Sequence, residues 1–305
     1  MTLTQLRYAV AVDIHRHFGR AAAQCCVTQP TLSMQLQKLE DELGFPLFDR
    51  SHQPVVATDL GAHVISQARV VLREQERIRD LVADVAHDMT GTLHLGIIPT
   101  LAPYVLPLVT VPFAEQYPGI EVHVREMPTA QIVEHLATDR LHAGLIATKE
   151  TQPGLESQVL FTEPFYAYVA SQHRLAGSET IQPQDLVVDD LWLLSEGHCF
   201  RDQVLNLCGK ASQAGCGNPV RFESGNLETL RILVNRTGGM TLLPYLATRY
   251  LSAEEQAYVR PLSVPVPRRK VRVIYGHAYL KRHLIQAYVD TLLAEVTPML
   301  EAIRG

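Results

Sequence analysis

Residues 21–50 read AAAQCCVTQPTLSMQLQKLEDELGFPLFDR, and this stretch decides the fold of the N-terminal part of the chain. An alanine-rich helix at residues 19–26 is followed by Thr28 and Pro30, which are typical of the cap and first turn of a second helix. That second helix ends at Gly44 and places leucines on one face at spacings of four, three and four residues: Leu32, Leu36, Leu39 and Leu43. Two short helices joined by a tight turn predict a helix-turn-helix.

The face opposite the leucines is polar. Polar side chains are what a helix needs on its exposed face to contact base edges in the major groove. The candidate DNA-binding residues on and before this helix are Thr28, Gln29, Pro30, Thr31, Ser33, Gln37 and Lys38. Residues 45–57 predict two short strands and a turn, a wing from which Arg50 can reach a phosphate or the minor groove. Charge adds nothing to this prediction, because residues 1–58 hold five Lys or Arg against five Asp or Glu.

A single long helix is predicted for residues 59–90, where proline is absent and Gly61 falls in the first turn. Its apolar stripe alternates spacings of four and three residues and has one polar member: Val64, Ala68, Val71, Gln75, Ile78, Val82 and Val85. This spacing is typical of a coiled-coil seam, so we expect the helix to pair with a second copy. The alternative is a lone amphipathic helix that packs on its own domain.

From residue 91 onward the pattern changes to alternating strands and helices. We expect strands at 92–98, 120–126, 143–147, 165–170, 190–194, 219–222, 239–243 and 271–276, and helices at 102–116, 129–138 and 281–303. Such alternation predicts largely parallel sheets with a cleft at the carboxyl ends of the strands.

Composition limits the class of protein. The 305 residues carry a net charge of −5 and are 47% hydrophobic, which suits ordinary folded cores and argues against nonspecific coating of nucleic acid. We find no apolar run of roughly 18 residues and no signal-peptide core, so we expect a cytoplasmic protein that does not bind membranes. In that compartment the five cysteines are not a structural framework, and a disulfide would be transient and functional.

The run 21–50, together with Thr58 and Gly61, resembles the N-terminal domain of LysR-type transcriptional regulators. The resemblance covers residues 1–90, and it implies an α+β multidomain fold. A winged helix-turn-helix (1–58) and a dimerising linker helix (59–90) precede an α/β regulatory domain (91–305). Two subdomains similar to periplasmic binding proteins are implied there, one at about 91–161 plus 268–305 and the other at about 162–267. The implied partners are double-stranded promoter DNA, RNA polymerase and a homotetramer whose linker helices pair; no cofactor and no enzyme activity are expected.

Residues 195–203, SEGHCFRDQ, and Cys208 resemble the redox segment of the hydrogen-peroxide sensors in the OxyR group of this family. The resemblance implies that Cys199 is the sensing thiol, that Cys208 is the resolving thiol, and that threonine hydroxyls hold the peroxide. The candidate peroxide pocket comprises Thr100, Thr129, His198, Asp202, Arg268 and Arg269. Sequence does not decide which of the two arginines faces the thiol.

Peroxide converts a thiolate to a sulfenic acid, which a second thiol can convert to a disulfide. If residues 199–208 form one helix, its rise of about 13.5 Å is incompatible with a disulfide, whose Cα atoms lie within about 7 Å. We therefore expect this segment to refold on oxidation. Packing explains Cys25, Cys26 and Cys216 more simply than reactivity does, although Cys216 could be a rival resolving thiol.

Other functions are less well supported. A metal site of His198, Cys199 and Cys208 lacks the usual ligand spacing, so no metal is expected. A thiol peroxidase would leave residues 1–90 unexplained, and a solute-binding protein would need a signal peptide. The main alternative is a LysR-type regulator induced by a small molecule in the cleft between its subdomains.

Overall fold

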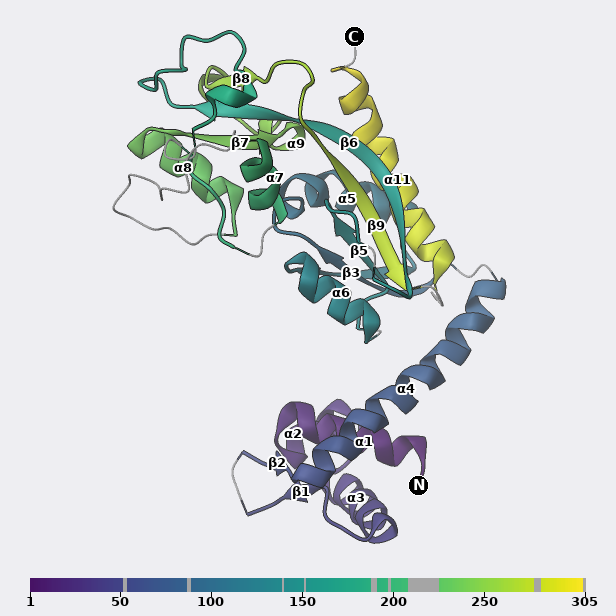
Figure 1. Cartoon of the computed structure of the whole chain (residues 1–305). Helices are drawn as coiled ribbons and strands as arrows, with labels where there is room; N and C mark the ends of the chain where they lie inside the picture. The colour runs from purple at the N-terminus through teal and green to yellow at the C-terminus, as the bar shows by residue number, and fades with distance from the viewer. Residues whose placement is uncertain are drawn as a thin grey trace. The chain divides into compact units, whose positions relative to one another are not determined.

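The computed structural model describes residues 1–51, 54–86, 89–138, 140–150, 152–187, 191–196, 199–207, 225–276 and 281–303. The chain divides into two compact units, Met1–Ala86 and His87–Gly305, each with its own hydrophobic core (Figure 1). Cys25 and Cys26 lie in the first unit and Cys199 in the second.

The first unit is helical with a small wing. Its elements are α1 (Leu3–His15), α2 (Phe18–Gln24), α3 (Gln29–Leu43), β1 (Phe48–Asp49), β2 (Val56–Ala57) and α4 (Asp59–Ala86). Leu32, Leu36 and Leu39 of α3 are fully buried, as their spacing predicts. β1 and β2 pair in antiparallel fashion, Phe48 opposite Ala57, and form the predicted wing.

The junction between the wing and α4 explains the Thr58 and Gly61 pair. The Thr58 hydroxyl accepts a hydrogen bond from the Gly61 N–H at 3.0 Å and donates one to the Pro46 carbonyl at 2.9 Å. A Cβ on Gly61 would lie 2.1 Å from the Leu47 carbonyl oxygen, so only glycine lets the helix start this close to β1.

The apolar stripe of α4 changes its environment along the helix. Ile65 and Ala68 are buried against the first unit's core, and Val64 is partly buried there. Farther along, Val71 is 38% exposed and Ile78 is 65% exposed. The start of α4 therefore belongs to the helical core, whereas Val71 and Ile78 face outward and Gln75 between them is half-buried. The side chains of residues 82 and 85 lie outside the described set.

The second unit is built on one mixed sheet. Its elements in chain order are β3 (Gly91–Ile97), α5 (Ala102–Gln116), β4 (Ile120–Glu126), α6 (Thr129–Ala137), β5 (Ala143–Ile146), β6 (Leu155–Val169), η1 (Pro183–Asp185), α7 (Cys199–Leu207), α8 (Leu227–Thr237), β7 (Met240–Pro244), α9 (Tyr245–Thr248), α10 (Ala253–Gln256), β8 (Val259–Pro261), β9 (Arg268–Gly276) and α11 (Arg282–Glu301). The strand order is β4-β3-β5-β9-β6-β7, with β8 also paired to β6.

The prediction of largely parallel sheets is wrong. β3 runs parallel to β4 and β5, but β9 pairs antiparallel with β5 and β6, and β7 and β8 pair antiparallel with β6. The cause is the long strand β6, whose first half lies along β9 and whose second half joins β7 and β8 (Figure 1). Among residues 191–194, only Leu191 forms an isolated bridge, to Met240, in place of the strand predicted at 190–194. The predicted strand at 219–222 lies outside the described residues.

Three chain segments leave the parallel strands at the same edge of the sheet. Thr100 follows β3, Thr129 begins α6 after β4, and Ala147 follows β5. α6 packs closely on this part of the sheet because Gly144 has no side chain; a Cβ there would lie 2.3 Å from Ile132 of α6. The carboxyl edge of β3, β4 and β5 is therefore where polar groups can converge. In the described part of the chain, no helix is long and apolar enough to cross a membrane.

Candidate functional site

Cys199 is the first residue of α7 and is half-buried against the core of the second unit. Phe200 and Val204 bury the inner face of the same helix at 2% and 1% exposure. The Phe200 ring meets the Phe165 ring of β6 edge-on, with centroids 5.5 Å apart. Apolar packing of α7 thus places the thiol at the N-terminal end of a helix, where a thiolate is favoured.

Arg269 is the arginine that faces this site. Its side chain is fully buried and donates from Nε to Glu163 Oε1 at 2.8 Å, from Nη1 to Thr100 Oγ1 at 3.1 Å and from Nη2 to the Thr100 carbonyl at 3.1 Å. The other oxygen of Glu163 accepts from the Leu246 N–H at 2.9 Å, so the buried ion pair has hydrogen-bond partners on both sides. The guanidinium carbon of Arg269 lies 5.8 Å from the centroid of the ring of Phe200, the residue that follows Cys199 in the chain.

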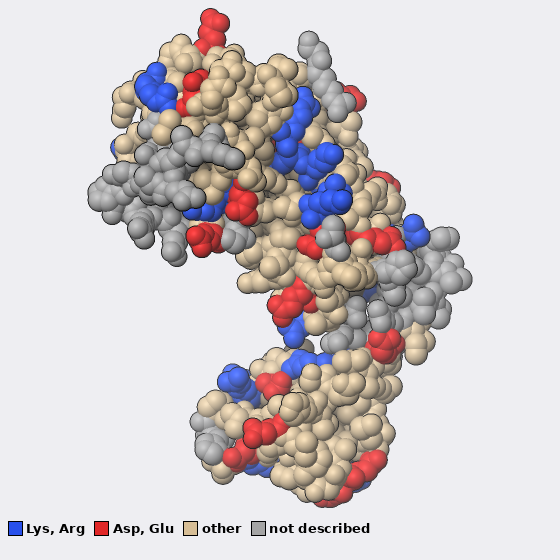
Figure 2. Space-filling model, viewed as in Figure 1, with Lys and Arg blue, Asp and Glu red and all other residues tan. Residues whose placement is uncertain are grey.

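Arg268 points the other way. It alternates with Arg269 along β9 and is exposed, as is Lys270. Figure 2 shows Lys and Arg side chains gathered over this strand. The alternation of a strand therefore separates the two arginines that the sequence left undecided.

Opposing effects set the pKa of the Cys199 thiol. Burial raises it and is the largest effect; the Arg269 charge, the Thr129 hydroxyl and the Phe200 N–H lower it, and the Asp202 carboxylate raises it again. The net result is a pKa above the ordinary value for cysteine. Asp202 is exposed, so it acts on the thiol through its charge rather than by forming part of the buried pocket.

Two buried oxygens near this thiol lack a hydrogen-bond partner among the described residues. One is Thr129 Oγ1, and the other is Oε1 of Gln203, which lies one turn after Cys199 on α7. The Gln203 Nε2 donates to the Ala147 carbonyl at 2.8 Å. Of the two, the Thr129 oxygen lies beside the thiol, and a small molecule with O–H donors, such as a peroxide or water, suits it; Gln203 is tied to the end of β5 instead.

The structure thus brings together Cys199, Thr100, Thr129 and Arg269 from the predicted set. His198 and Cys208 lie outside the described residues, and so does Cys216. Sequence reasoning missed Glu163 and the amide of Gln203. A signal for Glu163 exists, because an acidic residue between Phe161 and Phe165 on a buried strand needs a cationic partner.

The predicted DNA-binding residues lie together on the first unit. Thr28, Gln29, Pro30, Thr31, Gln37 and Lys38 are exposed on and before α3, and Ser33 is half-buried. Thr28 is the N-cap residue, but its hydroxyl makes no cap hydrogen bond and lies 2.8 Å from the Thr31 hydroxyl. The side chains of α3 that could read bases are therefore solvent-accessible.

Arg50 has a partner within the unit. Its guanidinium pairs with Glu40 Oε2 at 2.7 Å and lies 5.1 Å from the centroid of the Phe18 ring. Glu40 is 6% exposed, and its Oε1 accepts from the Leu47 N–H at 2.8 Å and the Phe48 N–H at 3.4 Å. This carboxylate therefore joins α3 to β1, and Arg50 is held on the wing side of α3.

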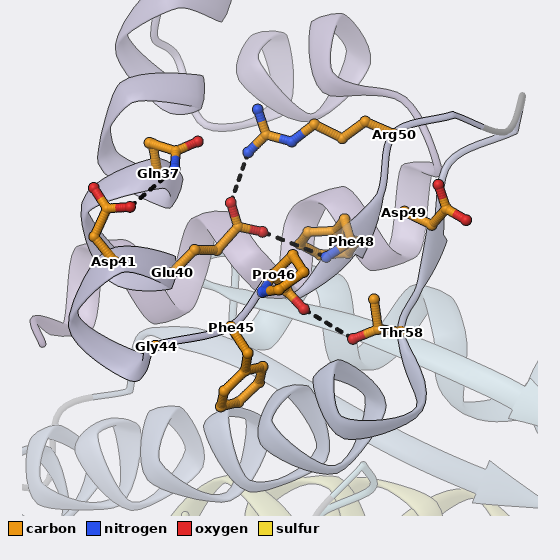
Figure 3. A pocket seen from close by; sticks show the side chains of 10 residues that line it. All are labelled: Gln37, Glu40, Asp41, Gly44, Phe45, Pro46, Phe48, Asp49, Arg50 and Thr58. Carbon is orange, nitrogen blue, oxygen red and sulfur yellow. Dashed lines mark hydrogen bonds and ion pairs between the residues drawn. The ribbon is translucent and has the colours of Figure 1, made fainter.

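A hollow of about 730 Å³ opens beside this junction (Figure 3). Its lining residues are Gln37, Glu40, Asp41, Gly44, Phe45, Pro46, Phe48, Asp49, Arg50 and Thr58. The Gln37 Nε2 donates a hydrogen bond to Asp41 Oδ1 at 3.0 Å. Three of the lining side chains are acidic. The hollow is a poor place for a phosphate, so the expected DNA contacts lie on the exposed face of α3 instead. Within the described ranges, no group of His, Cys, Asp and Glu can hold a metal ion.

Comparison with known proteins gives matches over most of the chain. Residues 3–62 match the family described as "Bacterial regulatory helix-turn-helix protein, lysR family", and residues 86–297 match "LysR substrate binding domain". The "Hydrogen peroxide-inducible genes activator" of Pectobacterium carotovorum subsp. carotovorum is 34% identical over 99% of both chains. The "DNA-binding transcriptional dual regulator OxyR" of Escherichia coli K12 is 37% identical over 90% of this chain and 89% of that protein.

Solved structures agree with these relatives. A full-length OxyR variant from Pseudomonas aeruginosa superposes with a TM-score of 0.74 and 34% identity, over 96% of this chain and 94% of that one. A Corynebacterium glutamicum OxyR mutant in an H2O2-bound form superposes with a TM-score of 0.64 and 28% identity, over 98% of this chain and 94% of that one.

Proposed function

The chain belongs to the LysR family of bacterial transcriptional regulators, and on this basis we propose that it senses hydrogen peroxide through Cys199 and activates genes from promoter DNA. The relatives described above are named for induction by hydrogen peroxide, and one related structure holds H2O2. The observation that carries the proposal is the half-buried Cys199 thiol beside Thr129, whose hydroxyl oxygen has no partner among the described residues.

The proposed chemistry has two steps. The Cys199 thiolate attacks one peroxide oxygen; the S–O bond forms as the O–O bond breaks, and the leaving hydroxide takes a proton to become water. The Cys208 thiolate then attacks the sulfenic sulfur, the S–S bond forms and a second water leaves. Thr129 and Thr100 orient the peroxide, and the Arg269 charge favours the thiolate.

The second step requires α7 to open. The helix places the Cα atoms of Cys199 and Leu207 about 12 Å apart along its axis. Cys208 follows Leu207, and neighbouring Cα atoms are about 3.8 Å apart. The Cα atoms of the two cysteines are therefore at least about 8 Å apart while α7 is intact, whereas a disulfide needs about 7 Å or less. Disulfide formation and an intact α7 exclude each other.

The remaining parts of the proposal concern DNA and assembly. Thr28, Gln29, Pro30, Thr31, Ser33, Gln37 and Lys38 contact DNA, with Arg50 at the wing. Residues 1–58 are the DNA-binding domain, 59–90 the linker helix and 91–305 the regulatory domain, whose subdomains comprise about 91–161 plus 268–305 and about 162–267. The exposed Ile78 supports pairing of linker helices in a homotetramer, which recruits RNA polymerase in the cytoplasm.

The test is to trap the sulfenic acid. Peroxide-treated Cys208→Ser protein should react with dimedone at Cys199, as read by mass spectrometry of the peptide. The matched control, Cys199→Ser, should take up no dimedone at the other cysteines at the same peroxide dose. Unmodified Cys199 at peroxide concentrations that oxidise free cysteine would refute the sensing role and leave a cleft ligand as the inducer.

A further inference from the structure

The Gln203 side chain joins α7 to the edge of the sheet. Its Nε2 donates a hydrogen bond of 2.8 Å to the carbonyl oxygen of Ala147, the residue that follows β5. Ala147 is 3% exposed, so this carbonyl lies away from bulk solvent. The other side-chain hydrogen bond described for α7 runs from Arg201 to the Leu194 carbonyl, in the segment just before the helix. Gln203 therefore makes the described side-chain hydrogen bond that ties α7 to the sheet.

The other contacts of α7 differ in kind. Phe200 and Val204 bury their side chains in the core, and such apolar contacts are non-directional, so they can be kept in part as a helix unwinds. The Gln203–Ala147 bond is directional and depends on the helix bringing residue 203 over the end of β5. Unwinding of α7 must therefore break it and leave the Ala147 carbonyl without this donor.

In the described part of the chain, only the N–H side of the Gln203 amide has a hydrogen-bond partner. Gln203 Oε1 is buried without a hydrogen-bond partner among the described residues. The side chain that holds α7 in place thus does so with a single bond, which suits a helix that must open on a signal.

We propose that Gln203 is a positioning residue that sets the rate of the second step, the conversion of the Cys199 sulfenic acid to the disulfide with Cys208. The inference rests on the proposed function. Peroxide attack on Cys199 needs no unwinding, because the thiol is already at the N-terminus of α7. Disulfide formation does need it. The hydrogen bond from Gln203 therefore slows the second step and leaves the first unchanged.

The variant that tests this is Gln203→Met. Methionine matches glutamine in length and helix propensity but has no N–H to donate. We expect disulfide formation roughly 3- to 10-fold faster than in the wild type, the range that corresponds to one lost hydrogen bond. In a Cys208→Ser background, the rate of sulfenic acid formation should stay within about 2-fold. The control, Asn206→Met, puts the same side chain on the exposed face of α7 and should leave both rates unchanged.

Hydrogen exchange gives a second readout that needs no oxidation. Backbone amides of α7 in the reduced protein should exchange faster in Gln203→Met than in wild type or Asn206→Met. Equal exchange and equal disulfide rates would overturn the inference while leaving peroxide sensing intact. Equal acceleration of both chemical steps would also overturn it, because that result indicates general destabilisation. A wild type that forms no disulfide at all would refute the proposed function, and with it the rate-setting role.

Discussion

The Cys199 thiol is subject to opposing influences from its neighbours. Burial raises its pKa most, and Arg269, Thr129 and the Phe200 N–H lower it without cancelling that effect. The thiolate is the nucleophile. Because the pKa is raised, only a small fraction of the Cys199 side chains is in the thiolate form at neutral pH. The hydroxyl and the charge beside the thiol therefore have a large influence on the rate.

Thr129→Val removes the hydroxyl and keeps the shape of the side chain. Without the hydroxyl beside the thiol, the pKa of Cys199 rises further and the peroxide loses an orienting group, so sulfenic acid formation should slow by about 3- to 10-fold. Dimedone trapping over time measures this rate. Thr110→Val is the control, because Thr110 is on the exposed face of α5 and its hydroxyl donates a hydrogen bond to the Leu106 carbonyl. Equal rates in the two variants would remove Thr129 from the pocket.

His142 should make the second unit sensitive to acid. Its Nδ1 accepts a 2.8 Å hydrogen bond from the His94 N–H; burial first, then the charges of Lys281 and His94, lower its pKa to about 3. The pKa of His94 is lowered as well, by burial first and then by neighbouring charges. A histidine whose pKa falls on folding contributes its full stabilisation when the pH is above the pKa of the unfolded state, about 6.5. This stabilisation is lost as the pH falls from there toward 3.

The corresponding variant is His142→Gln, which keeps a hydrogen-bond acceptor and cannot titrate. Between pH 6.5 and about 4, the wild-type free energy of unfolding should fall faster than that of the variant, by up to about 1.4 kcal/mol per pH unit. Trp192 is the single tryptophan of the chain and lies in the second unit, so its fluorescence during urea unfolding follows this unit. Parallel pH profiles in the two proteins would contradict this assignment.

Most of the thiol site could be predicted at the residue level, since Thr100, Thr129, Cys199 and Arg269 all meet there. What sequence could not decide was orientation. Arg268 and Arg269 differ only in which side of β9 they occupy, and that depends on strand register. The amide of Gln203 could not be predicted either, because its partner is a backbone carbonyl 56 residues away in the chain.

Among the elements, α3 and the wing are held together by one buried carboxylate. Glu40→Ala removes two backbone hydrogen bonds and the partner of Arg50, so we expect a loss of about 1–3 kcal/mol in the first unit's stability. Operator affinity should fall too, because the wing loses its fixed position on α3. Thermal melting and footprint titrations measure the two effects.

Glu42→Ala is the matched control for that variant. Glu42 is on the same helix but exposed, and its ion pair with the N-terminal amine is a surface contact. Such pairs contribute about 0–1 kcal/mol, so the control should melt close to wild type. If Glu40→Ala behaved like the control, the carboxylate would not hold the wing.

The exposed end of the α4 stripe makes a prediction about assembly. Ile78→Asp places a charge at a position that is 65% exposed in the single chain and buried if linker helices pair. We expect the mass in sedimentation to drop toward that of a smaller assembly. Leu60→Asp is the control, because Leu60 is 54% exposed but lies off the stripe. Equal masses for both variants and the wild type would refute pairing through α4.

Periodicity predicted the helices well and the sheet only in part. The predicted helix at 102–116 agrees with α5, whose apolar spacing reflects one buried face, and the predicted strand at 120–126 agrees with the edge strand β4. The first half of β6 was missed, since Ser157, Gln158 and Val159 are exposed and show no buried alternation. Which strands pair antiparallel depends on long-range contacts that no local pattern encodes.

Across the whole molecule, the thiol and α3 lie in different units. Cys199 lies in His87–Gly305 and α3 in Met1–Ala86, each with its own core. If the proposed function is correct, a redox signal at Cys199 must reach α3 from the other unit, and we propose that opening of α7 is its first event. On the proposed function, oxidation at Cys199 and altered DNA binding are one event.

Whether the two coincide can be measured by peptide mapping of the cysteines combined with DNase footprinting, before and after peroxide. We predict that a Cys199–Cys208 disulfide appears over the same peroxide range in which the footprint changes, and that Cys199→Ser shows neither. A footprint that changes while Cys199 stays reduced, or a disulfide that leaves the footprint unaltered, would contradict the account.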